Sequence, residues 1–135
     1  MTHLKAFIAG FVSTLVFHQS VLWLLAHGTA GIPVWDMTPV PPLGVPRVVS
    51  LAFWGGVWGI ALWAMIRNTR GTPYWLRALV IGALGPTLVA MFVVAPLKGK
   101  AIAFGWDPKF IVGGLLVNAA WGLGTAVLMR AMPRS

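Results

Sequence analysis

Cysteine is absent from this sequence, and acidic residues are almost absent, since Asp and Glu together number two among 135 residues. Without cysteine, the chain forms no disulfide, thiolate metal site, iron–sulfur cluster or thiol nucleophile. Charged residues of both signs make up 9% of the chain, whereas soluble domains carry about 25%. This composition excludes a free-standing soluble globule, a disordered tail and a coiled coil.

Apolar side chains dominate what remains, at 59% of the residues and a mean hydropathy of +0.86. Four apolar runs are each close to the roughly 20 residues that cross a bilayer: 4–26, 46–66, 73–95 and 108–129. We therefore predict an all-α membrane protein, a four-transmembrane-helix bundle. The chain forms one integral membrane domain, residues 1–135, with a long outer loop at 27–45.

Proline supports the predicted helix starts independently of hydropathy. Pro46, Pro73 and Pro108 stand where a first helical turn would begin, the position at which a missing N–H costs least. Thr72 and Asp107 precede two of these prolines, so we expect them to be N-caps. Asp107 is thus interpreted as a cap rather than as a catalytic acid.

The basic residues give the chain a formal charge of +8, yet they stand at the ends of the apolar runs and form no stripe. This spacing is typical of a membrane protein and argues against nucleic-acid binding. With the N-terminus inside, six Lys or Arg lie on the cytoplasmic side and four on the other. The positive-inside rule then predicts an inner-membrane protein with both termini cytoplasmic, although so small a difference leaves dual topology open.

The outer side carries the candidate residues for a site at the mouth of the bundle: His27, Asp36, Arg47 and Asp107. An interfacial enzyme using the first three is an alternative, but no hydrolytic triad is complete, and we predict no enzymatic activity. Loop 27–45 also contains Trp35 and Met37, which we expect to pack across the bundle as part of a lid.

A weak internal repeat runs through the chain. Trp35-Asp36 resembles Trp106-Asp107, and Trp58-Gly59 stands at the same distance from Arg67 as Trp121-Gly122 does from Arg130. The repeat favours two parallel-repeated helical hairpins, an arrangement found in some transporters.

Small residues recur at four-residue spacing in every span, which predicts close helix packing, because lipid offers no hydrophobic force between helices. Most of the positions predicted to pack the helices are glycine: Gly10, Gly55, Gly59, Gly82, Pro86, Gly114 and Gly122.

Polar residues interrupt the spans at one depth. Counting about 1.5 Å of rise per residue places one polar layer somewhat outside the midplane. The predicted layer contains five side chains: His18, Gln19, Trp54, Thr87 and Asn118. Because buried polar groups in lipid need partners, we expect these residues to face the bundle interior or a subunit interface.

Three interpretations of the layer follow. In the first, the side chains hold the helices together in a non-enzymatic structural or accessory subunit that forms a homo-oligomer or docks on a larger membrane complex. In the second, they line a channel or passive transporter for a small neutral or anionic solute. In the third, His18 alone binds haem or a pigment. We predict no metal and no cofactor, since the three histidines are too far apart along the chain to share one ion.

Overall fold

The computed structural model describes residues 2–26, 35–41 and 43–132, and the first helical span within it has three parts. α1 (Thr2–Ser13) runs into a π-helical turn, η1 (Thr14–His18), and then into α2 (Gln19–Ala26). A short hairpin of β1 (Pro39–Val40) and β2 (Val45–Pro46) precedes α3 (Arg47–Ile66).

The second half of the chain repeats this order without a sheet. α4 (Thr72–Val89) runs into a second π-helical turn, η2 (Ala90–Val94), and into α5 (Ala95–Leu97). A 3-10 turn, η3 (Ile102–Trp106), leads into α6 (Pro108–Ala131).

Four continuous helical stretches are long and apolar enough to cross a membrane: Thr2–Leu25, Arg47–Ile66, Thr72–Leu97 and Pro108–Ala131. The prediction of an all-α chain with four such helices is confirmed. The sequence placed most helix ends within about two residues of those observed.

The predicted helix starts at Pro73 and Pro108 follow their expected chemistry. The start at Pro46 does not, because Pro46 ends β2 and is the N-cap of α3, which begins at Arg47. Pro73 and Pro108 lie in the first turns of α4 and α6, and the Asp107 carboxylate accepts a bond from the Lys109 N–H at 3.0 Å. The prediction for Thr72 is wrong: it is the first residue of α4, while Gly71, with φ of 63°, is the N-cap. Glycine adopts this left-handed conformation without steric cost.

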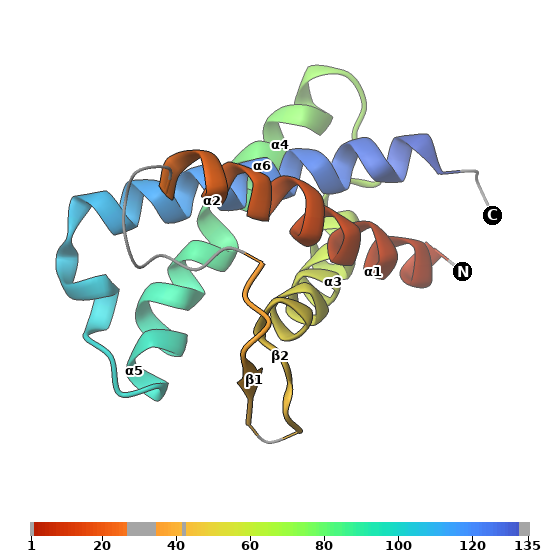
Figure 1. Cartoon of the computed structure of the whole chain (residues 1–135). Coiled ribbons are helices and arrows are strands. Elements are labelled where there is room, and N and C mark those ends of the chain that lie inside the picture. The colour runs from red at the N-terminus through yellow and green to blue at the C-terminus, as the bar shows by residue number, and fades with distance from the viewer. Residues whose placement is uncertain (1, 27–34, 42, 133–135) are drawn as a thin grey trace.

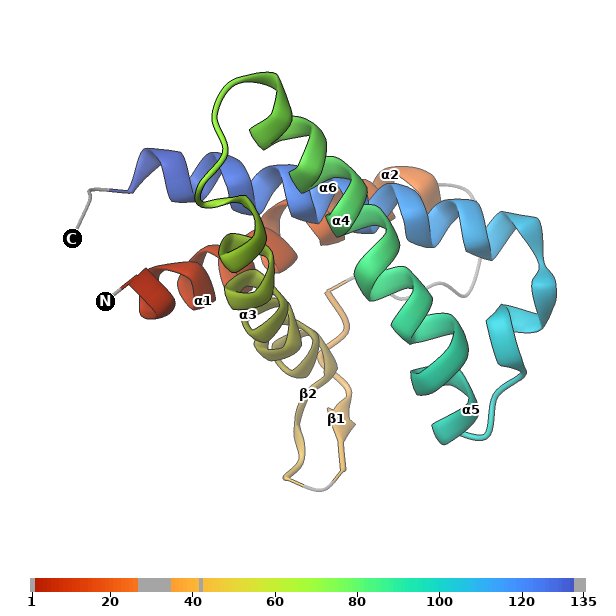
Figure 2. The ribbon, with the colours of Figure 1, turned by 180° about the vertical axis from the view of Figure 1, so that it is seen from behind.

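The four spans form two hairpins of consecutive helices. α1 packs mainly on α3, and α4 packs mainly on α6, while α1 and α6 join the two pairs. In Figure 1, α1 and α2 run beside α6, and α3 and α4 cross this pair; Figure 2 shows the same crossing from behind.

Glycine sets the distance at both crossings. A Cβ on Gly59 would stand 2.5 Å from the Ala6 carbonyl oxygen and 3.0 Å from the Gly10 Cα. A Cβ on Gly122 would stand 2.5 Å from the Ala78 oxygen and 2.9 Å from the Gly82 Cα. The two helix backbones therefore touch directly at each site, and any side chain on the glycine would prevent this contact.

The remaining packing positions differ in crowding, and a Cβ on Gly10 would overlap the Gly55 carbonyl oxygen. A Cβ on Gly55 would overlap the Thr14 hydroxyl, so this glycine belongs to the first crossing. At Gly114 the nearest atoms would be 3.7 Å away, an ordinary contact. Pro86 lies inside α4, shortly before the π-helical turn η2.

The lid expected from loop 27–45 is not what the described part of the loop forms. The β hairpin projects away from the bundle at the end where α3 begins (Figures 1 and 2), and the Met37 side chain is 64% exposed. Prolines at 39, 41 and 46 cannot donate to helical bonds, which favours this extended turn over a packed cover. His27 lies outside the described residues.

Gly59→Ala and Gly122→Ala are each expected to lower the free energy of unfolding by about 1–3 kcal/mol, because the new methyl meets backbone. Gly113→Ala in α6 is the matched control, since a Cβ there meets nothing within 4 Å. All three substitutions raise helix propensity by about 1 kcal/mol, so the difference between them reports the crossing. Reversible unfolding in detergent micelles measures it, and three equally stable variants would contradict the close approach.

Candidate functional site

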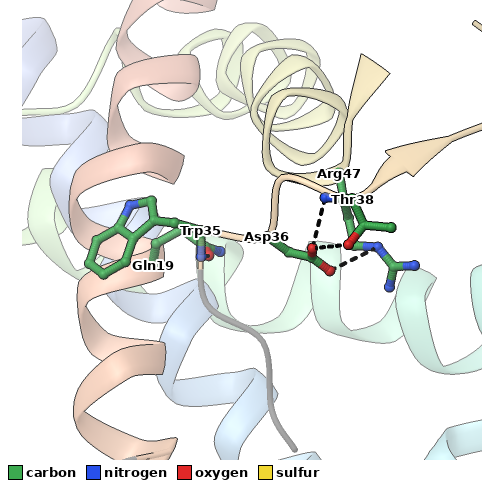
Figure 3. A network of polar contacts seen from close by, with 5 residues as sticks. All are labelled: Gln19, Trp35, Asp36, Thr38 and Arg47. Atoms are coloured by element: carbon green, nitrogen blue, oxygen red, sulfur yellow. Dashed lines mark hydrogen bonds and ion pairs between the residues drawn. The ribbon is translucent and has the colours of Figure 1, made fainter. Parts of the chain in front are cut away.

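Polar side chains from the first span, the loop and two other helices form one connected set. At its start, the backbone N–H of Trp35 donates to Gln19 Oε1 at 2.8 Å (Figure 3). The Trp35 indole N–H donates to the Leu15 carbonyl at 2.8 Å, within the π-helical turn η1. Two bonds therefore fasten the loop to the first span.

His18 continues the set through its ring. Gln19 Nε2 lies 3.0 Å from His18 Nδ1. Because an amide NH2 group only donates, Nδ1 accepts this bond and the ring proton is on Nε2. The Asn118 side chain also hydrogen-bonds His18. The imidazole thus has two polar neighbours, Gln19 and Asn118.

Asn118 passes the set on to α4. Its Nδ2 donates to Thr87 Oγ1 at 2.8 Å, and the Thr87 hydroxyl donates to the Gly114 carbonyl at 3.3 Å. Each donor therefore has an acceptor, from a backbone N–H at one end to a backbone C=O at the other. We call His18, Gln19, Thr87 and Asn118 the polar chain.

The structure brings together four of the five residues predicted for the polar layer. Trp54 does not join them: its side chain is 57% exposed and packs edge-on against Phe53 at 5.3 Å. The face of α3 that meets the bundle carries Ala52, Gly56 and Gly59, and helical geometry turns residue 54 away from it. Counting residues along the helix predicted a level for Trp54 but not the face on which its side chain lies.

The outer-mouth candidates separate into two places. Asp36 Oδ1 accepts from the Thr38 hydroxyl at 2.6 Å and from its N–H at 2.9 Å, while Arg47 Nε lies 3.4 Å from Asp36 Oδ2 (Figure 3). The hydroxyl bond, then the N–H bond and Arg47, hold the pKa of Asp36 below its ordinary value. Asp107 is engaged separately, as the cap of α6.

Three further hydrogen bonds join the helices, and the sequence predicted none of them. Ser13 Oγ donates to the Trp121 carbonyl at 2.7 Å, and the Trp121 indole donates to the Gly10 carbonyl at 3.1 Å. Tyr74 OH donates to the Ala126 carbonyl at 2.7 Å. The signal available for Tyr74 was its rarity, because the chain has one tyrosine.

A separate apolar hollow lies beside the β hairpin. It has a volume of about 290 Å³ and is lined by Pro41, Leu43, Val45, Val49, Ser50 and Phe53. Among the described residues, no three His, Asp or Glu side chains gather as metal ligands. Comparison of the chain with protein-family models, curated proteins and solved structures gives no match.

Thr87→Val is expected to destabilise the bundle by about 1 kcal/mol, because it leaves the Asn118 amide without its acceptor. Asn118→Leu in the same chain removes the stranded amide, so the double variant should lose less than the sum of the singles. A double-mutant cycle of unfolding in detergent should give a coupling energy of about 0.6–1.7 kcal/mol. The exposed Thr72→Val is the control, and additive effects of the two substitutions would contradict the bond.

Proposed function

We propose that this chain is a four-span inner-membrane protein with a structural or accessory role, which self-associates or docks on a larger membrane complex. The polar chain supports this proposal most directly. It begins on the Trp35 N–H, ends on the Gly114 carbonyl and includes no carboxylate. Its groups bond to one another between helices, as groups that hold a bundle together do.

The fraction of each span that is buried within a single copy of the protein also supports association. Between 28% and 33% of the residues in each span's most apolar window are buried. The other faces suit lipid or a neighbouring subunit.

The polar chain also bears on the two alternatives. A pathway for a small neutral or anionic solute remains the second candidate, because His18, Gln19, Thr87 and Asn118 are continuous through three spans and would line it. Ligation of haem or a pigment by His18 is disfavoured, since its ring already has two hydrogen-bonding neighbours, Gln19 at Nδ1 and Asn118.

Liposomes that contain the purified protein separate the structural role from the pathway. We expect the flux of small neutral solutes and anions to stay within about twofold of protein-free vesicles. The reason is that the side chains of the polar chain hydrogen-bond to one another and to the backbone rather than to a solute. Native mass spectrometry of the same sample should show complexes larger than one chain. Flux that Asn118→Leu abolishes, while Thr72→Val preserves it, would overturn the structural role; a monomer without flux or partners would overturn it as well.

We further infer that the bundle is two parallel-repeated hairpins, residues 2–66 and 72–131. Gly59 and Gly122 follow Trp58 and Trp121, and a Cβ on either glycine would stand 2.5 Å from the facing carbonyl oxygen, of Ala6 or of Ala78. The first span of each hairpin contains one π-helical turn. Each tryptophan reaches the other hairpin: Trp121 bonds Gly10, and the Trp58 ring lies 3.1 Å from the Cβ position of Gly85. Equal losses from Gly59→Ala and Gly122→Ala are the test of this correspondence.

The turn before the second helix of each hairpin supports the same inference. Trp35 and Trp106 both have left-handed backbones, with φ of 48° and 59°, and the Asp after each accepts from the N–H two residues on. The carbonyl of Asp36 then accepts from Val48 N–H, and that of Asp107 from Ile111 N–H. Residues 39–46, the β hairpin, account for the longer first connection, and the Arg47 N–H closes it on the Thr38 carbonyl at 2.9 Å.

Both termini are proposed to be cytoplasmic, because Lys5, Arg67, Arg70, Arg77, Arg130 and Arg134 then lie inside. A phosphatase fused after Ser135 should be inactive, and a cytoplasmic fluorescent reporter at the same place should be active. The opposite result would reverse the orientation. Equal activity of both fusions would indicate dual topology and contradict a single orientation.

A further inference from the structure

Four exposed arginines lie at the end of the bundle where α3 and α6 finish and α4 begins. Arg67 follows α3, Arg70 lies in the connection, Arg77 is in the first turns of α4, and Arg130 is in the last turn of α6. We call Arg67, Arg70, Arg77 and Arg130 the arginine rim. Because the spans alternate in direction, the rim shares its end of the bundle with both termini.

Aromatic packing holds three helices together beneath the rim. Tyr74 of α4 meets Trp63 of α3 edge-on, with ring centroids 6.4 Å apart, and it bonds the Ala126 carbonyl of α6. Arg130 Cζ lies 4.0 Å from the centroid of the Tyr74 ring. A cation over a ring is attracted to its face while its N–H groups stay free to donate outward.

The rim has no acidic side chain to neutralise it. The chain contains two, and both belong to the opposite end: Asp36 bonds Thr38 and Arg47, and Asp107 caps α6. Four guanidinium groups thus share one end of a small bundle, where like charges repel. An anion from outside the chain would relieve this repulsion.

We propose that the arginine rim binds the phosphate groups of anionic phospholipids in the adjoining leaflet. This inference rests on the proposed insertion in a bilayer. Guanidinium groups bond phosphate oxygens in pairs, and basic clusters next to membrane spans attract anionic lipids. Trp63 and Trp75 lie within one or two turns of the rim, at the depth that indoles prefer in a bilayer. This placement favours lipid over an acidic protein segment.

The opposite end supplies three basic residues that match three of the rim arginines in charge. Lys98, Lys100 and Lys109 also follow or precede the spans there and are exposed, but Asp36 and Asp107 share that end with them. Replacing three of these lysines or three rim arginines by Gln removes the same net charge. Arg130 is left intact in both variants, because its contact with Tyr74 also packs the helices.

The test is native mass spectrometry of the full-length protein with phosphatidylglycerol and phosphatidylcholine in equal amounts. The wild type should bind the anionic lipid with at least about tenfold preference. Arg67→Gln/Arg70→Gln/Arg77→Gln should lose most of this preference, and Lys98→Gln/Lys100→Gln/Lys109→Gln should keep it. Arg67→Lys/Arg70→Lys/Arg77→Lys should keep part of it, because charge remains but paired bonding does not.

Three results would overturn the proposal: no preference in the wild type, equal loss in the Arg→Gln and Lys→Gln triple variants, or displacement of the lipid by inorganic phosphate at millimolar concentration. Displacement by a poly-glutamate peptide at micromolar concentration would point to an acidic protein partner instead and would also overturn it. Circular dichroism of each variant checks that the helices are retained. Solute flux through the protein would leave these lipid measurements unchanged, so the structural role and the lipid site fail separately.

Discussion

Direct contact between helix backbones is the constraint on which the rest of this structure depends. At Gly59 and Gly122 the facing carbonyls of Ala6 and Ala78 leave no space for a side chain. Within a bilayer, apolar surfaces would gain nothing from association, so van der Waals contact at such crossings would supply what the hydrophobic effect supplies in water. The crossings make each hairpin a unit and bring the polar groups beside them within bonding distance.

Closeness at the crossings also determines how the two hairpins join. The Gly10 backbone is near enough to α6 for the Trp121 indole to reach its carbonyl, while Ser13 reaches the Trp121 carbonyl in return. A helical carbonyl that already accepts a backbone bond has a second lone pair, so these bonds add to the helix without breaking it. The polar chain also joins the two hairpins, about one turn further along the first span, through His18, Asn118 and Thr87.

Hydropathy and spacing were sufficient for the spans, for the cap of α6 and for the glycines at the crossings, because each depends on residues near in sequence. They were insufficient to predict which face of a helix points into the bundle. Trp54, predicted at the depth of Asn118, has an exposed side chain, and Trp121, noted in the sequence only as part of the repeat, is buried and joins the hairpins. The π-helical turns carry no signature of their own in sequence, and they rotate every residue that follows them.

Scarcity of acid shapes the two ends of the molecule differently. At the end with the β hairpin, one carboxylate closes the base of the hairpin with Thr38 and Arg47, and the other caps α6, so each has a local structural partner. At the other end the arginines have aromatic rings and solvent around them but no carboxylate side chain. In this bundle the four side chains of the polar chain bond to one another and to the backbone, while the buried Trp63 indole N–H has no partner among the described residues. The arginines gather where a neighbouring molecule is able to balance their charge. The interior of the bundle thus needs no ligand to hold it together, whereas the charge at its rim does call for one.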